Sequence, residues 1–463
     1  MENFWGSEVW GTFNMIAVLL LSLLAANIMR RKIPFLRDSL IPVSVLGGIL
    51  LVVLSAVYKW ITGTQIFMTE FFGGNGYGSM EVLTYHCLAL GFIASTFKPS
   101  QGEMTKKRAG EVFNTGVTTV ATYLLQAVLG FGISLLAAML IKDFFQAAGV
   151  LLPFGYGQGP GQAMNYGNIY EADYGCVGGK SFGLTIAALG FVSASIGGVI
   201  HLNWLKRKGK IKLERKEDNK ESHQIHTENE IPMQESMDKM TVQIALIAVA
   251  YMLSYVLMYL LGLALPGMKS VIYGFNFLLG VLAATIVKGV LKLLQKTKLM
   301  KREYTNDFLM TRTSNFFFDL MVVASIGVIR LDLLEDYWGI MLIMGVVGML
   351  STYLYNLWVA KKLFPAYAQE QFLMMFGMLT GTASTGVILL REIDGDFKTP
   401  AADNMVYQNF PAIVFGFPLM LLATLAPQKP WLTFGILVGF FLVMNLILFR
   451  NSIFRRKKKE TEE

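Results

Sequence analysis

The chain has 463 residues, of which 54% are hydrophobic and 16% are charged. This composition excludes an ordinary soluble domain, because many apolar runs reach the roughly 20 residues that a helix needs to cross a bilayer. The formal net charge of +8 does not indicate nucleic-acid binding, since its carriers, such as LKRKGKIKLERK and FRRKKKE, adjoin apolar runs and would face anionic lipid headgroups. The sequence therefore predicts an all-α polytopic membrane protein.

About eleven apolar runs are candidates for membrane spans. The first follows Glu2 and Glu8 rather than basic residues, so we expect no cleaved signal peptide. Lys and Arg are retained on the cytoplasmic side of membrane proteins. We therefore expect the N-terminus outside and the C-terminus in the cytoplasm. With this orientation only six of the 40 basic residues lie outside: Lys59, Lys142, Lys180, Lys269, Arg330 and Lys429. The predicted spans are 11–29, 40–60, 80–97, 113–140, 181–204, 241–262, 270–290, 313–330, 337–360, 404–427 and 430–449.

One long polar segment, 213–240, is rich in charge and poor in aromatic residues, which predicts a solvated cytoplasmic linker. It separates two halves, 1–212 and 241–427. Each half has four apolar runs, an interruption rich in Gly, Ser or Thr, and a fifth run. Because five is an odd number of crossings, the second half would be inverted relative to the first, an arrangement typical of secondary transporters. Residues 428–463 would add a further span and a basic cytoplasmic tail.

The interruption in the first half reads LLPFGYGQGPGQAMNYG, residues 151–167. The segments between the fourth and fifth runs, 141–180 and 361–403, are too long for a turn and too interrupted for one crossing. We predict a re-entrant hairpin in each, near 145–178 from outside and near 366–395 from the cytoplasm, with the tips meeting near the midplane. Non-helical backbone survives at membrane depth only inside protein or beside a water-filled cavity. These breaks would therefore free backbone groups for a ligand.

These segments also have other interpretations. Gly, Ser and Thr also promote close helix packing in membranes, although glycines at a spacing of two in the first segment do not follow one helix face. GYGQG lacks the Thr-Val that precedes it in potassium filters. YGCVGGKS has Tyr174 where a phosphate-binding loop needs Gly, and no strand precedes it. No ATP motor is encoded, so uphill transport would use an ion gradient.

A carboxylate solute needs hydrogen-bond donors, which main-chain N–H groups at helix breaks and side-chain amides and hydroxyls supply. Structural hydrogen bonding between the hairpin arms is the alternative for the same residues. The predicted substrate-binding residues are Gln158, Gly159, Gly161, Gln162, Asn165, Gly381, Thr382, Ser384 and Thr385.

Isolated polar residues inside a membrane are expensive and are functional candidates by default. The alternatives are pairing at the interface for Asp319, helix packing for Thr185 and a polar helix end for Asn404 and Gln408. Sodium prefers oxygen ligands, including carbonyls freed by a broken helix, and the two cysteines match no metal spacing. The predicted sodium ligands are Asp319, Thr185, Asn404 and Gln408, with a counter-charge as a second role for Asp319. His86 and Arg391 are more typical of a satisfied buried histidine and a cytoplasmic anchoring charge.

The two interruptions also resemble those of the bacterial sodium/glutamate symporter family. GYGQGPGQA is similar to that family's GGHGTGAA-like first hairpin, and GTASTGV to its GATPTAI-like second hairpin. IPVSVLGGILLVV and GLTIAALGFVSASIGGVI are similar to the family's second and fifth spans. The resemblance implies a dimeric, sodium-coupled importer of glutamate in the bacterial cytoplasmic membrane, without an organic cofactor. It also implies an elevator mechanism, in which a hairpin-bearing transport domain slides along a scaffold domain.

The chain departs from the family pattern at several positions. Gln158 stands where the family has His, and Pro160 stands where it has Thr. Gln162 and Asn165 add amides, and the polar linker and last span are also unlike compact members. These differences bear on the substrate more than on the mechanism. A sodium- or proton-coupled carrier of di- or tricarboxylates is therefore a second hypothesis, and a channel or sensory membrane module is a third. An enzyme is not expected, because no nucleophile and base pair or acidic dyad occurs at depth.

Overall fold

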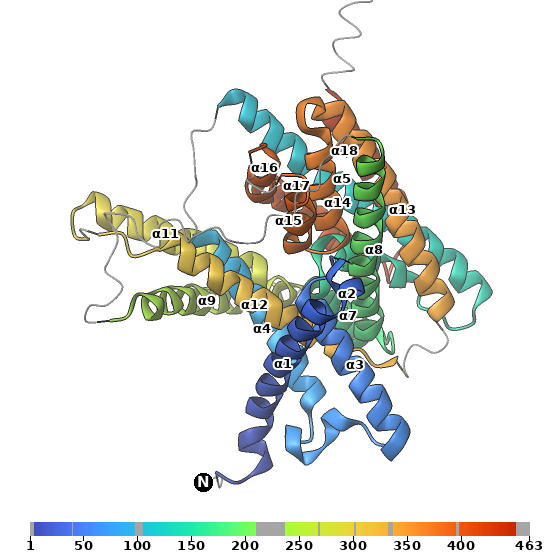
Figure 1. Ribbon diagram of the computed structural model, residues 1–463, viewed down its shortest axis with the longest axis vertical. Coiled ribbons are helices and arrows are strands. Elements are labelled where there is room, and N and C mark those ends of the chain that lie inside the picture. Colours follow the sequence, from blue (N-terminus) through green and yellow to red (C-terminus); the bar gives the residue numbers. More distant parts are fainter. Residues whose placement is uncertain are drawn as a thin grey trace, which may run out of the picture. The chain divides into compact units, whose positions relative to one another are not determined.

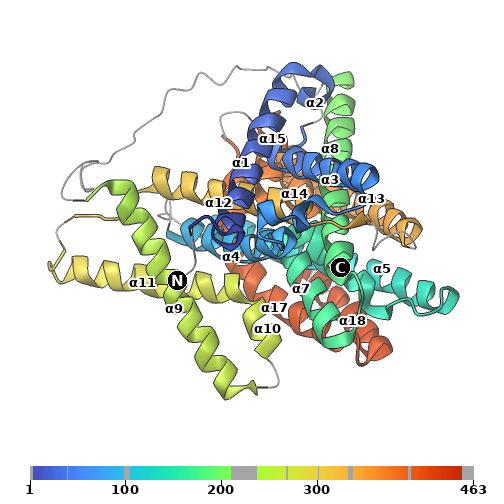
Figure 2. The same ribbon diagram turned by 90° about the horizontal axis from the view of Figure 1, so that it is seen from below.

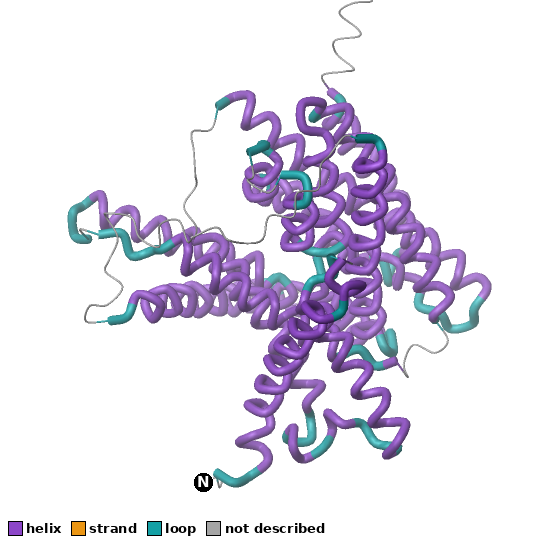
Figure 3. The backbone as a smooth tube through the Cα atoms, in the orientation of Figure 1, coloured by secondary structure: helices purple, strands orange, loops and turns teal. Residues whose placement is uncertain are grey.

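The computed structural model describes residues 4–38, 40–97, 105–209, 237–266, 269–300, 302–331, 337–394 and 398–450. These residues form helices joined by loops, without a strand element (Figure 3). The predicted linker, apart from 237–240, and the basic tail lie outside them. Nine described helices are long and apolar enough to cross a membrane, which confirms a multi-pass helical membrane protein. They are α1 (Ser7–Lys32), α3 (Val43–Thr62), α4 (Gly76–Phe97), α5 (Lys106–Leu140), α8 (Gly179–Arg207), α9 (Lys239–Ala264), α11 (Asn276–Lys296), α13 (Trp338–Leu363) and α18 (Pro430–Leu448).

The other two predicted spans, 313–330 and 404–427, are not among these nine helices, so the number of about eleven spans stays a prediction. The first lies in α12 (Asp307–Gly327), whose first half contains the polar run TRTSN. The second is divided at Gln408 into α16 (Ala401–Tyr407) and α17 (Asn409–Leu425). Proline at positions 411 and 418 removes backbone donors from α17. Hydrophobicity alone did not reveal this division.

The described chain forms two compact units, each drawn from both halves of the sequence. Unit 1 comprises Met1–Leu23, Gly47–Glu103 and Glu217–Val328. In it α4 packs against α9, α11 and α12, and Figure 2 shows α9 and α11 beside each other. Its buried cluster includes Ile93, Phe97 and Ile247. Most of α1 and α3 also belongs to unit 1, together with the short elements η1 (Ile66–Met68), η2 (Glu70–Phe72) and α10 (Lys269–Gly274).

Unit 2 comprises Leu24–Leu46, Met104–Lys216 and Ile329–Glu463. Its long helix α5 packs against α13, α17 and α18, and α8 packs against α13 and α14 (Figure 1). The final apolar helix α18 is thus part of unit 2, where the Phe434 ring meets Phe131 of α5. The shorter elements of unit 2 are α2 (Pro34–Asp38), η3 (Gln146–Val150), α6 (Leu151–Pro153), η4 (Phe154–Gln158), α7 (Pro160–Tyr174), η7 (Pro365–Tyr367), α14 (Ala368–Thr380) and α15 (Ala383–Arg391).

Candidate substrate and ion site

The first helix break lies at Gly159, between the π-helical turn η4 and helix α7. Gly159 has φ 88° and ψ 175°, a conformation essentially restricted to glycine. Pro160 follows as the first residue of α7, where its missing N–H costs nothing and its fixed φ suits a helix start. The sequence Gly-Pro therefore stops one helix and starts the next. Single π-helical turns such as η4 occur frequently at functional sites.

The glycines before the break have a packing role. A Cβ at Gly155 would lie 2.8 Å from Ile186 Cγ2 of α8, and a Cβ at Gly157 would overlap the Tyr123 ring of α5. A Cβ at Gly159, in contrast, would meet nothing closer than 3.6 Å. Close packing thus accounts for Gly155 and Gly157, whereas Gly159 is required for its backbone conformation.

The second helix break consists of Gly381 and Thr382, between α14 and α15. Thr382 is extended, with φ −140° and ψ 172°. The two flanking helices approach each other through glycine, because a Cβ at Gly377 would lie 2.8 Å from Gly386 Cα. Small residues permit such close backbone contact between helices in membranes.

The structure brings the two breaks together within unit 2. A Cβ built on Gly159 would lie 3.6 Å from Thr382 Cγ2 and 3.9 Å from the Gly381 carbonyl oxygen. Helix α8 lines both breaks, since Gly190 packs against the Thr380 carbonyl and the Tyr156 ring. The Tyr156 hydroxyl lies 2.9 Å from Ser193 Oγ and donates to the Gly345 carbonyl oxygen at 2.7 Å. Segments more than 200 residues apart in the sequence therefore form one centre.

Several buried polar atoms of unit 2 have no hydrogen-bond partner among the described residues. An unsatisfied buried donor or acceptor costs about 1–3 kcal/mol, so each needs an explanation such as a ligand. Gln162 is 1% exposed, and its Oε1 accepts a hydrogen bond from Asn165 Nδ2 at 3.2 Å. Its Nε2 has no acceptor among the described residues. Near the first break and α8 these atoms are Gln126 Oε1, Gln158 Oε1, Gln162 Nε2 and Thr185 Oγ1.

The electrostatics of the breaks come from neutral groups. The start of α7 presents N–H groups of Gly161 and Gln162 that have no acceptor within their own helix, and such helix starts favour anions. The end of η4 presents carbonyl oxygens, which favour cations. No Lys or Arg of unit 2 is buried in the part of the chain that the structure describes. Charged ligands here would therefore meet dipoles and amides rather than buried basic side chains.

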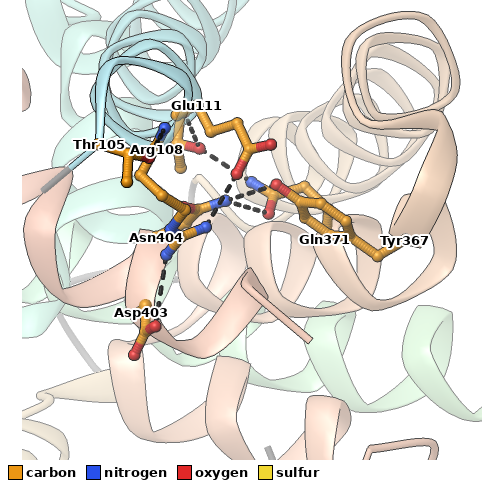
Figure 4. Close-up of polar contacts among 8 residues, drawn as sticks. Thr105, Arg108, Glu111, Tyr367, Gln371, Asp403 and Asn404 are labelled. Atoms are coloured by element: carbon orange, nitrogen blue, oxygen red, sulfur yellow. Dashed lines mark hydrogen bonds and ion pairs between the residues drawn. The ribbon is translucent and has the colours of Figure 1, made fainter. Parts of the chain in front are cut away.

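A second polar cluster surrounds Asn404 of α16 (Figure 4). Asn404 Nδ2 donates to the Tyr367 hydroxyl at 3.0 Å and to Gln371 Oε1 at 3.2 Å, and Gln371 Nε2 donates to Thr115 Oγ1 at 3.1 Å. The side-chain oxygens of Asn404 and of Gln408, four residues later, have no partner among the described residues. Two buried amide oxygens are thus available to a hard cation.

An ion-pair group borders this cluster in Figure 4. Arg108 Nη1 lies 2.8 Å from Glu111 Oε2, and Arg108 Nη2 lies 3.3 Å from Asp403 Oδ2. The first pair lies within α5 and the second connects α5 to α16. Both carboxylates are partly or largely exposed, so the pairs add little stability.

The remaining predicted residues lie in several places. Thr382 Oγ1 is 3.4 Å from Thr385 Oγ1, and the Thr385 side chain is buried. Ser384 belongs to α15, but its side chain is outside what the structure describes. Asp319 belongs to α12 of unit 1 and is exposed, so the structure does not group it with the residues of unit 2. His86, also in unit 1, lies 2.6 Å from the Tyr251 hydroxyl, and Arg391 is exposed at the end of α15.

Sequence reasoning missed Gln126, which is fully buried in α5. A signal was present, because Gln126 is an isolated strongly polar residue in the apolar run YLLQAVLGF. Its contacts connect α5 to the start of the second break, since its Nε2 donates to the Leu379 carbonyl oxygen at 2.8 Å.

The architecture and paired helix breaks define a helical multi-pass membrane protein with a polar centre inside one unit. Comparison with protein families matches residues 10–367 to the sodium/glutamate symporter family. The match covers more than half of the chain, so the chain belongs to this family and is a transporter rather than an enzyme. The matched region includes the first break and ends before the second. Comparison with curated proteins gives no match.

Proposed function

We propose that this chain imports L-glutamate or a related anionic amino acid together with Na⁺ across the bacterial cytoplasmic membrane. Membership of the sodium/glutamate symporter family supports the class of transport. The observation that carries the proposal is the meeting of the two breaks, beside buried amides that lack protein partners. Such groups lose hydrogen bonds when water is excluded and recover them when a polar solute binds.

The substrate carboxylates would bind at the start of α7. Main-chain N–H groups of Gly161 and Gln162 and the unpartnered Gln162 Nε2 are donors at one helix start. Thr382 and Thr385 would add hydroxyl donors from the second break, with Gly381 and Ser384 beside them and Asn165 orienting Gln162. The ammonium group needs acceptors, and Gln158 Oε1 and the Gly381 carbonyl oxygen are suitable.

Sodium would bind to neutral oxygens. Asn404 Oδ1 and Gln408 Oε1 are unpartnered and separated by one helical turn, and Thr185 Oγ1 is a third unpartnered oxygen in unit 2. Asp319 stays a proposal as a counter-charge in unit 1. Positive charge from the ion offsets the cost of placing an anion in a site without buried basic side chains.

The lengths of the helices beside the two breaks support a re-entrant arrangement. Helices α7 and α14 have 15 and 13 residues, fewer than the roughly 20 that cross a bilayer. We propose that 145–178 and 366–395 are re-entrant hairpins of two inverted repeats, 1–212 and 241–427, with the N-terminus outside and the C-terminus inside. Unit 2, which contains both breaks, would be the moving domain of an elevator, and unit 1 the scaffold of a homodimer. Basic segments between spans would contact anionic lipids.

Uptake by purified protein in liposomes tests the function. With radiolabelled L-glutamate, an inward Na⁺ gradient should drive accumulation above equilibrium, whereas an equal choline gradient should not. Absence of stimulation by Na⁺ would contradict sodium coupling. Preference for citrate over glutamate would favour the di- and tricarboxylate carrier, and conductance without accumulation would favour a channel.

A further inference from the structure

We propose that Gln126 supplies its carbonyl oxygen to a monovalent cation, Na⁺ in the transport cycle, bound at the end of η4 beside the first break. This inference rests on the proposed function and adds a ligand that sequence reasoning did not include. Four observations support it: the orientation of the amide, its position, the character of the surrounding atoms and the charge of the site.

The orientation of the Gln126 amide is determined by its partners. One side-chain atom lies 2.8 Å from the Leu379 carbonyl oxygen and 2.8 Å from Thr352 Oγ1. A carbonyl oxygen only accepts hydrogen bonds, so the atom facing Leu379 must be Nε2. The opposite orientation would place two carbonyl oxygens against each other. Gln126 Oε1 is therefore directed away from α14, and it has no partner among the described residues.

The position of Gln126 Oε1 is beside the last turn of η4. It lies 3.2 Å from the place that a Cβ would occupy on Gly157 of η4, where the Tyr123 ring also packs. The next residue, Gln158, has a side-chain oxygen that is also buried without a partner. At least one unpartnered amide oxygen, that of Gln126, therefore lies beside the end of this helical turn.

The polar atoms at the end of η4 are oxygens, beside the apolar ring of Tyr123. Gly159 stops the helix, so the last carbonyl groups of η4 have no partner within their own helix. The end of a helix has partial negative charge. Carbonyl and amide oxygens are ligands for hard cations such as Na⁺ rather than for anions or soft metals. Among the described residues no group of three or more His, Cys, Asp or Glu could hold a metal ion, so neutral oxygens are the suitable ligands.

The charge of the site favours a cation over a second anion. The start of α7 favours the negatively charged part of a solute, and no Lys or Arg of unit 2 is buried among the described residues. A cation at the end of η4 would lie on the opposite side of the same break, where it attracts the solute in a medium of low dielectric constant. Binding of the ion and of an acidic solute would then be coupled.

Thermal unfolding of the purified full-length protein in detergent, without substrate, tests the inference. Wild-type protein should be stabilised by NaCl relative to equimolar choline chloride, with a saturable dependence on concentration. Gln126→Leu should raise the half-saturating Na⁺ concentration about tenfold or more. Gln126→Glu keeps one side-chain oxygen facing η4 and adds negative charge, so it should lower that concentration, while its second oxygen replaces the donor to Leu379 and should lower the melting temperature in choline.

Thr352→Val is the matched control, because it removes one partner of Gln126 Nε2 and leaves Oε1 unchanged. It should lower the melting temperature in choline and leave the half-saturating Na⁺ concentration as in wild type. If Gln126→Leu and Thr352→Val shift the half-saturating Na⁺ concentration equally, or if Gln126→Glu leaves it unchanged, Gln126 has only a structural role. If Gln126→Leu does not fold, the result for Gln126→Glu decides. The inference is also overturned if Na⁺ does not stabilise the wild-type protein. It is likewise overturned if a water molecule occupies the position beside Gln126 Oε1 and the sodium affinity of Gln126→Leu equals that of wild type.

Sodium-driven glutamate uptake in liposomes separates this inference from the proposed function. If wild type accumulates glutamate with Na⁺ and Gln126→Leu has an unchanged sodium dependence, only the role of Gln126 fails. If wild type shows no sodium-driven uptake while the thermal shift depends on Gln126, the cation site stands and the proposed function fails.

Discussion

The two helix breaks of unit 2 are held by different interactions. After the first break, α7 carries three tyrosines one turn apart that donate to carbonyl oxygens near the end of α17. Tyr166 donates to Met420 at 3.0 Å, Tyr170 to Ala423 at 2.7 Å and Tyr174 to Thr424 at 3.0 Å. The Tyr166 ring also stacks on Phe154 of η4 with a centroid distance of 3.9 Å. Directional bonds therefore fix α7 to one neighbour in one register.

After the second break, α15 has nine residues and packs through apolar contacts. Leu389 lies against Gly198 of α8, and Gly386 lies against α14. The described polar contact of its first turn, between Thr382 and Thr385, stays within the break itself. Apolar contacts lack a preferred direction, so α15 can shift at smaller cost than α7. We infer from this difference that, in the proposed transport cycle, the first break would be the fixed frame for the ligand and the second the part that opens.

The largest predicted effect concerns the fixed frame. Gln162→Glu keeps the acceptor for Asn165 and replaces the unpartnered Nε2 by a charged oxygen. A negative charge beside a bound carboxylate costs several kcal/mol, so we expect the KM for glutamate to rise about 100-fold or more in liposome uptake.

The structural alternative for Gln162 predicts the opposite result. Glu in the first turn of a helix interacts favourably with the helix dipole, so a residue that only supports α7 should tolerate this change. An unchanged KM with unchanged thermal stability would remove Gln162 from the substrate site. Gln428→Glu is the control for added charge, since Gln428 bonds to Tyr174 at the other end of α7 and is exposed there.

The second prediction tests whether the frame depends on backbone conformation. Gly159→Ala places a Cβ in ordinary contact with its neighbours, at 3.6 Å or more, so steric overlap is absent. The conformation itself should cost about 1–3 kcal/mol for a residue with a side chain. We expect uptake at low substrate concentration to fall about tenfold.

Gly439→Ala in α18 provides the control for Gly159→Ala, because a Cβ there meets nothing within 4 Å and the residue is helical. Wild-type uptake by both variants would show that Gly159 is not required for the geometry of the first break. Equal losses in both would indicate a general intolerance of alanine rather than a defined conformation.

The third prediction compares the two arms directly by amide hydrogen exchange. Regions held by few directional contacts open at lower free energy, so amides of α15 should exchange about tenfold faster than those of α7 in the absence of ligands. Addition of Na⁺ and glutamate should protect α15 more than α7. Equal protection of both arms, or faster exchange in α7, would contradict the assignment of α15 as the opening part.

The sequence was sufficient to locate both breaks but not to explain them. Gly159 and Pro160 form a local signal, and the structure places the break there. The separate packing roles of Gly155 and Gly157 depend on α8 and α5, far away in the sequence, and could not be predicted from spacing. The division of the span 404–427 at Gln408 was missed because hydropathy averages over a local break.

Prediction from the sequence had a similar limit for the side chains of the site. Polarity within apolar runs singled out Asn404 and Gln408, yet only the structure reveals which atom of each amide is left without a partner. Gln126 was overlooked because one polar residue in an apolar helix is also common in structural hydrogen bonds. Its meaning depends on Leu379, a residue of the other half of the chain.

The smallest predicted effect tests the tyrosine contacts that distinguish α7 from α15. Tyr170→Phe removes one hydroxyl bonded to a carbonyl oxygen at the end of α17 and retains the buried ring. Loss of this bond should lower the free energy of unfolding by about 0.5–1.5 kcal/mol, measured by thermal unfolding in detergent. Exchange of α7 amides should rise while the KM for glutamate stays near wild type, because the hydroxyl lies at the distal half of α7. Tyr255→Phe, an exposed tyrosine of α9 in unit 1, should change neither quantity. If Tyr170→Phe leaves α7 exchange unchanged, hydrogen bonding does not hold the first arm, and the contrast between the two breaks must come from apolar packing alone.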